Sequence, residues 1–184
     1  ALISLDSLKK SGRYQELYDS LSTYFSSSPS SFVYYDELIR AGSASGNLLL
    51  LKNRLDNIRP ILISDYELYA RAVILNLRGN VDSSISIIKD VFFFFFAKNT
   101  ILLHYANSLR EKGRYGEVLE LIKAHYKPND SESYISADIL ILKGNISFVQ
   151  GKYEEAEKFY SEASAIAAPA YDLYAVAKAK INTG

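Results

Sequence analysis

The apolar residues of this chain recur at helical spacing, in segments separated by glycines and prolines. In the stretch YELYARAVILNLRG, Leu68, Ala72 and Leu75 stand at i, i+4 and i+7, which places their side chains on one face of a helix. In YEEAEKFYSEASAIA, Ala156 and Ala163 belong to a stripe of the same period. The hydrophobic pattern therefore predicts a succession of amphipathic helices.

Five glycines follow such helical stretches at nearly constant intervals. The intervals are 34, 33, 34 and 38 residues, between Gly12, Gly46, Gly79, Gly113 and Gly151. A glycine just past the end of a helix adopts the left-handed conformation without a Cβ penalty. Each junction therefore predicts a tight turn between two antiparallel helices. The prolines, which end helices, fall between the predicted hairpins, at Pro29, Pro60, Pro128 and Pro169.

A helical hairpin that returns about every 34 residues resembles the tetratricopeptide repeat (TPR) family. Residues 137–169 carry the most matches, which fall on repeat positions 8, 15, 17, 20, 24 and 27: Gly144, Gly151, Tyr153, Ala156, Tyr160 and Ala163. Residues 99–132 and 65–98 also match, whereas residues 32–64 are degenerate. Lys143 and Ser147 depart from the family, because large apolar residues are usual at their positions.

The resemblance implies an all-α fold, a right-handed superhelical solenoid of antiparallel helix hairpins with about five repeats plus a terminal helix. We expect one array spanning 1–184, with units at approximately 1–31, 32–64, 65–98, 99–136 and 137–169 and a terminal helix at 170–184. Four extra residues within 127–133 are expected to lengthen the loop before the last full unit. The unpaired last helix and the absence of a starting Met favour a fragment of a longer array; the alternative is that this helix is the cap.

Composition narrows the classes of function. Lys and Arg number 21, as do Asp and Glu, so the formal net charge is zero and no basic run is present. Nucleic-acid binders usually carry a basic surplus, and nucleic acid is therefore not an expected partner. No apolar run approaches the roughly 20 residues of a transmembrane helix. The compartment is undetermined, with the cytoplasm favoured and no export signal visible in this sequence.

Catalysis has little support in the sequence. The two histidines, His104 and His125, fall in different predicted helices, and no nucleophile or oriented third group accompanies either of them. The chain has no cysteine and no His or carboxylate spacing typical of a metal site. We therefore predict a protein that is not an enzyme and uses no metal or cofactor.

The resemblance also implies a peptide-binding groove lined by the first helix of each hairpin. Carried over position by position, its residues are Tyr66, Tyr69, Val73, Asn76, Leu103, Asn107, Arg110, Ile141, Asn145, Phe148, Tyr171 and Tyr174. Tyrosine offers a large contact area with a polar tip, and an asparagine amide both donates to and accepts from a peptide backbone. The alternative is that aliphatic members such as Leu103 and Ile141 pack against neighbouring helices.

Five consecutive phenylalanines, Phe92–Phe96, stand at the predicted end of a second helix. Successive helical residues turn by about 100°, so no single core face accommodates all five. The family's pattern implies that Phe92 and Phe94 are buried in the seam between units. Phe93, Phe95 and Phe96 are then candidates for an exposed apolar docking patch.

Together these observations predict a non-catalytic scaffold or adaptor that binds a partner peptide or helix in its concave groove, within a multi-subunit assembly. Two alternatives stay open: a regulatory array attached to an enzyme or transcription factor, and an envelope or flagellar assembly factor. Self-association through the ends of the array is a further expectation, because a repeat buries its apolar face only against its neighbours.

Overall fold

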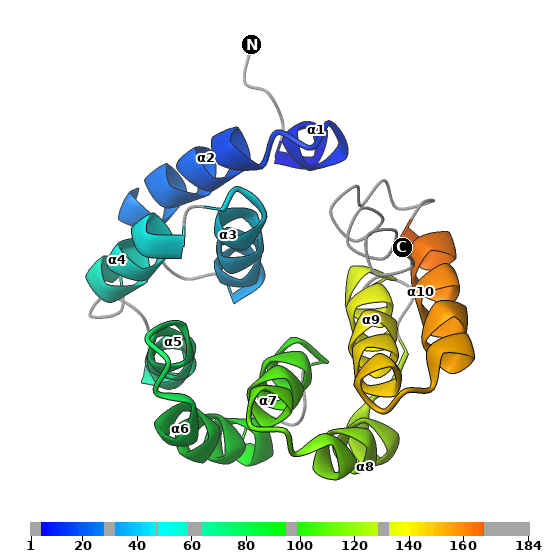
Figure 1. Ribbon diagram of the computed structural model, residues 1–184. Helices are drawn as coiled ribbons and strands as arrows, with labels where there is room; N and C mark the ends of the chain where they lie inside the picture. Colours follow the sequence, from blue (N-terminus) through cyan, green and yellow to red (C-terminus); the bar gives the residue numbers. More distant parts are fainter. Residues whose placement is uncertain are drawn as a thin grey trace. The chain divides into compact units, whose positions relative to one another are not determined.

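The computed structural model describes residues 5–27, 32–46, 48–58, 64–94, 99–128 and 133–167 (Figure 1). Within these ranges the regular structure is helical: α1 (Leu5–Lys10), α2 (Tyr14–Ser27), α3 (Phe32–Ala44), α4 (Leu48–Ile58), α5 (Ser64–Leu77), α6 (Val81–Phe94), α7 (Asn99–Glu111), α8 (Tyr115–His125), α9 (Ser133–Val149) and α10 (Tyr153–Ala167). The predicted terminal helix at 170–184 lies outside the described residues.

The helices form two compact units, residues 1–96 with α1–α6 and residues 97–184 with α7–α10. Within each unit every helix contacts the next one along the chain. In the first unit the second helices of two successive hairpins, α2 and α4, also touch. In the second unit the first helices, α7 and α9, touch. This is the contact pattern of stacked helical hairpins, in which each pair buries its apolar face against a neighbouring pair.

The five junction glycines all have positive φ, between 69° and 78°, as the sequence predicted. At Gly79 the turn closes with a backbone hydrogen bond, in which the N–H of Asn80 donates to the carbonyl of Leu75, five residues earlier, at 2.9 Å. The same bond joins Arg114 to Leu109 at 3.0 Å. This pairing is the Schellman motif, which satisfies carbonyls at the end of a helix and requires a left-handed residue between them. The glycine repeat is therefore a repeat of one turn geometry.

The connection before the last full unit is longer than the preceding one, as expected, with residues 126–132 between α8 and α9 and residues 95–98 between α6 and α7, and α9 is lengthened as well. This helix begins at Ser133, one turn before the expected start at residue 137, and it has 17 residues. The preceding helix, α8, ends at His125, and Tyr126 adopts an extended conformation (ψ 124°). Lys127, the residue before Pro128, is biased away from helical geometry, which disfavours a continuation of α8 through this segment. Lys127 is anchored instead, because the Asn99 amide donates to its carbonyl at 2.8 Å.

Lys143 and Ser147, the two polar departures from the repeat pattern, find partners on α10. The ammonium of Lys143 lies 5.8 Å from the ring centroid of Phe159, within the range of a cation–π contact. The Ser147 hydroxyl donates to the Glu155 carboxylate at 2.9 Å. Polar contacts thus replace apolar packing at these two positions of the α9–α10 hairpin.

The α5–α6 hairpin contains a buried hydrogen bond, in which the Ser84 hydroxyl donates to the Ala72 carbonyl at 2.7 Å. Ser84→Ala is expected to lower the free energy of unfolding by about 0.5–1.5 kcal/mol, the usual net value of such a bond. Ser83→Ala, on the exposed side of the same helix, is the control and is expected to be neutral or slightly stabilising. Urea unfolding followed by circular dichroism checks this pair, and equal losses would contradict the assignment.

Of the phenylalanine run, Phe92 is buried with 2% of its surface exposed, as expected for a core position. The helix α6 continues to Phe94. The side chains of Phe93 and Phe94, and residues Phe95 and Phe96, lie outside the described part of the structure. The predicted apolar docking patch therefore stays a prediction.

Candidate functional site

Helix α7 is buried over most of its circumference and accessible along one stripe. Leu103, Asn107 and Arg110 are half-buried and Glu111 is exposed, at i, i+4, i+7 and i+8. Their neighbours Leu102, Ala106 and Leu109 are buried. The residues assigned to the groove on this helix are thus among its accessible residues. His104 is half-buried at the edge of the stripe.

Arg110 is the member of this stripe with the most unusual environment. Among the described residues, none accepts a hydrogen bond from its buried Nε. A buried donor without an acceptor costs about 1–3 kcal/mol, so this side chain is held in place at a cost in stability. A guanidinium carries five donors in a rigid fork and is suited to carboxylate or carbonyl oxygens.

Three other groove candidates lie in the core. Tyr69 and Ile141 are 0% and 1% exposed, and Val73 is also buried. Ile141 packs with Ala163 and Ala167 of α10. The repeat positions taken from the TPR family identify which residues stand on first helices. Whether each side chain is exposed depends on the neighbouring helices that cover it. These three side chains therefore contribute to packing, which for Ile141 was the alternative reading of the sequence.

The asparagines expected to hold a peptide have partners inside the protein. The Asn107 amide donates to the Leu103 carbonyl at 3.0 Å, within its own helix. The Asn145 side-chain oxygen accepts a hydrogen bond from the Tyr160 hydroxyl of α10 at 2.9 Å. Asn76 is half-buried on α5. These bonds orient the amides of Asn107 and Asn145, whose capacity for a partner is therefore smaller than the sequence alone indicates.

Phe148, at the C-terminal end of α9, is the most exposed of the groove candidates whose side chains the structure describes, at 53%. Its ring meets that of Tyr153 edge to face, with centroids 5.3 Å apart, and Val149 and Tyr153 are exposed beside it. The remaining candidates, Tyr171, Tyr174 and the side chain of Tyr66, lie outside the described residues.

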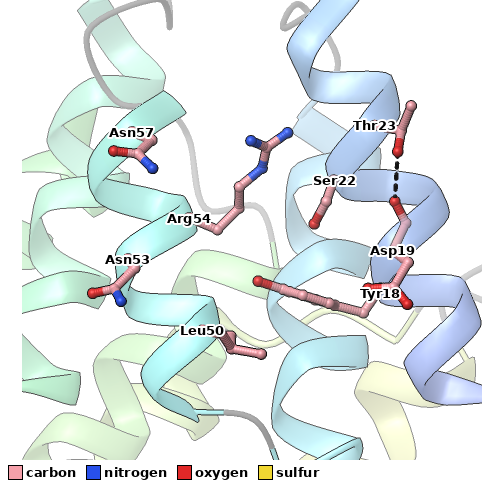
Figure 2. A pocket seen from close by; sticks show the side chains of 8 residues that line it. All are labelled: Tyr18, Asp19, Ser22, Thr23, Leu50, Asn53, Arg54 and Asn57. Carbon is pink, nitrogen blue, oxygen red and sulfur yellow. Dashed lines mark hydrogen bonds between the residues drawn. The ribbon is translucent and has the colours of Figure 1, made fainter.

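A pocket that the sequence did not predict lies in the first unit, between α2 and α4 (Figure 2). Its volume is about 550 Å³. Figure 2 shows the Arg54 side chain reaching from α4 into the space between the two helices. The lining side chains are Tyr18, Asp19, Ser22, Thr23, Leu50, Asn53, Arg54 and Asn57.

The α2 wall of this pocket is organised by hydrogen bonds. Burial raises the pKa of the Tyr18 phenol, while the neighbouring Ser22 hydroxyl and the positive charge of Arg54 offset part of that rise. The Thr23 hydroxyl donates to the Asp19 carbonyl at 3.0 Å. The Asp19 carboxylate accepts from the Gln15 amide at 3.0 Å. The positive charge of Arg54, on α4, thus acts across the pocket on the Tyr18 phenol of α2.

A signal for this pocket is visible in the sequence of α4. Asn53, Arg54 and Asn57 are interleaved with Leu51 and Leu55, which are buried. The polar side of the helix is thus specified locally. That this side faces Tyr18 and Ser22 of α2 follows only once the two hairpins are stacked, because the two walls, residues 18–23 and 50–57, lie far apart in the sequence.

The described residues hold no group of three or more His, Cys, Asp or Glu side chains that would bind a metal ion. His104 and His125 stand on α7 and α8, both half-buried. None of the helices in the described ranges combines the length and apolarity required to cross a membrane.

No protein-family model matches the sequence, and no curated protein is similar enough to count as a match. Among solved structures, the chain is similar to the crystal structure of a tetratricopeptide repeat protein from Parabacteroides merdae. The TM-score is 0.52 and the identity 14%, covering 96% of this chain and 80% of that one. At this identity the likeness concerns the fold, which is an all-α helical solenoid. Proteins of this class commonly use their extended surfaces to bind other proteins.

Proposed function

We propose that the protein is a non-catalytic scaffold or adaptor that binds a peptide or helix of a partner protein along the first helices of its hairpins. The observation that carries the proposal is the α7 stripe of Leu103, Asn107 and Arg110. It offers an apolar contact, an amide and a guanidinium whose buried Nε lacks an acceptor among the described residues. A partner's backbone carbonyl or carboxylate would accept hydrogen bonds from the terminal nitrogens of this half-buried guanidinium, since the Nε itself is covered by the protein.

Arg110 provides a test that separates binding from stability. Arg110→Met keeps the aliphatic length and removes the buried donor, so the free energy of unfolding is expected to stay constant or rise by up to about 1 kcal/mol. Partner binding is expected to weaken by about tenfold or more, since a charge-assisted hydrogen bond contributes about 1.5–3 kcal/mol. Thermal unfolding and quantitative co-precipitation from the cells that produce the protein measure the two effects.

The matched control is Arg114→Met. Arg114 is an exposed arginine at the start of α8, paired with Glu117 at 2.6 Å. Because surface ion pairs contribute little, this variant is expected to retain both stability and the co-precipitated partners. A partner that both variants hold as well as the unmodified protein would contradict the proposed role of the α7 stripe.

A second pair of variants tests the apolar part of the stripe. Leu103→Asp places a charge on the proposed contact surface, whereas Leu119→Asp places the same charge on the exposed side of α8. We expect the first variant alone to lose the partner, with helical content unchanged in both by circular dichroism. Loss with Leu119→Asp alone would move the binding surface to the second helices.

A further inference from the structure

The pocket between α2 and α4 shares no residue with the α7 stripe. It is formed by second helices, in the other compact unit. Its volume of about 550 Å³ lies within the range of roughly 300–1,000 Å³ typical of ligand sites. The chemistry of its walls indicates what such a ligand carries.

The α4 wall presents its groups at a regular spacing. Leu50 and Arg54 are four residues apart, as are Asn53 and Asn57, which corresponds to about 6 Å along a helix axis. In an extended peptide, alternate residues repeat at about 6.6 Å and point to the same side. The wall thus matches a peptide that seats one side chain at Leu50 and the side chain two residues away at Arg54.

The two asparagines suit the backbone of such a peptide. Asn53 and Asn57 are exposed at the pocket and stand one turn apart on α4. Each amide can accept from a peptide N–H and donate to a peptide carbonyl, without regard to the side chains. Backbone contacts at two successive points fix the register of an extended segment.

The pocket lining carries one charge of each sign, and Arg54 is the group that can bind an acidic side chain. Among the lining residues that the structure describes, Arg54 carries the positive charge and Asp19 the negative charge. Asp19 is exposed and already accepts from Gln15. Because a guanidinium has five donors, Arg54 can keep its contacts within the protein and still bind a carboxylate.

An apolar surface adjoins the opposite end. Leu49 and Leu50 are 67% and 53% exposed, on consecutive positions of α4. Leu50 belongs to the pocket lining and Leu49 extends beyond it. Covering two exposed leucines with a partner's apolar side chain removes apolar surface from water, which favours association.

We propose that the α2–α4 pocket binds an extended segment of a partner protein, with a Glu or Asp side chain against Arg54 and an apolar side chain two residues away against Leu50. The site recognises a short acidic-apolar sequence. It is independent of the α7 stripe, so the protein holds two contact surfaces of different chemistry.

The test is a titration of the ¹⁵N-labelled protein with the synthetic peptide acetyl-Leu-Ala-Glu-amide at millimolar concentrations. The side-chain N–H signals of Arg54, Asn53 and Asn57 are expected to shift. The matching peptide with Gln in place of Glu is expected to bind about tenfold more weakly, since it lacks the charge-assisted bond. Equal affinity for the two peptides, or no shift of these signals, would overturn the proposal.

Variants of single residues test whether the peptide binds in the α2–α4 pocket. Arg54→Gln is expected to abolish the preference for the Glu peptide, and Arg54→Lys to retain part of it, which guards against a loss caused by misfolding. Asn53→Ala is expected to weaken both peptides equally. Arg78→Gln is the charge control, because Arg78 pairs with Asp56 at 2.5 Å and does not line the pocket.

Failure of this proposal is distinguishable from failure of the proposed function. Leu103→Asp and Arg110→Met are expected to leave peptide binding at the α2–α4 pocket unchanged. If these variants weaken the Glu peptide while Arg54→Gln does not, the acidic segment belongs to the α7 stripe, and the pocket is not its site.

Discussion

Replacing Phe92 with alanine is expected to lower the free energy of unfolding by about 3–5 kcal/mol. Phe92 stands in the last turn of α6 and is almost fully buried. Its truncation removes buried apolar area and leaves a cavity that the surrounding helices fill only partly. Because single domains are stable by only about 5–15 kcal/mol, the change should be large in a urea unfolding curve.

Phe148→Ala is the matched control for this prediction. Its ring is half exposed and packs edge to face on Tyr153, so the loss is expected to stay below about 1.5 kcal/mol. Similar losses for the two variants would contradict the core position of Phe92. A small loss for Phe92→Ala would place the phenylalanine run outside the packed interior.

Gly144→Ala is expected to destabilise the protein by about 1–3 kcal/mol, the usual cost of overpacking. A Cβ at this position would lie 2.7 Å from Cδ1 of the Tyr160 ring. Tyr160 is buried, and its hydroxyl donates to Asn145, so the ring has little room to move. The helices α9 and α10 would have to separate.

Gly116→Ala is expected to change the stability in the opposite direction. Gly116 also lies within a helix, α8, but a Cβ there would meet no atom within 4 Å. The substitution is expected to stabilise the protein by about 0.4–1 kcal/mol, because alanine loses less backbone entropy on folding than glycine does. Thermal unfolding of the two variants measures both values. A loss for Gly116→Ala, or a gain for Gly144→Ala, would contradict the packing described for these helices.

The fold was predictable from the sequence because its strongest signals are local. A glycine with positive φ is required at each hairpin turn, so Gly12, Gly46, Gly79, Gly113 and Gly151 mark the turns directly. Gly144 and Tyr160 were both assigned to repeat positions, but their close contact is known only from the structure. The start of α9 at Ser133 was not predicted, because extra residues can lengthen either a loop or a helix.

The candidate site was less predictable because exposure depends on packing between helices. The repeat register identifies the first-helix positions of Tyr69, Val73 and Ile141, but not the neighbours that bury them. On α7 the accessible stripe coincides with the assigned positions. The α2–α4 pocket depends on the stacking of two hairpins, which no local pattern specifies.

The measurement that tests the proposed function most directly is photo-crosslinking in the cells that produce the protein. A photoreactive amino acid replaces Glu111 on the α7 stripe or, as the matched control, Glu120 on the exposed side of α8. We predict that a discrete partner protein is crosslinked from position 111, is absent from position 120, and is lost when Arg110→Met is added. Crosslinks of the same partner from both positions, or from position 120 alone, would contradict binding along the first helices.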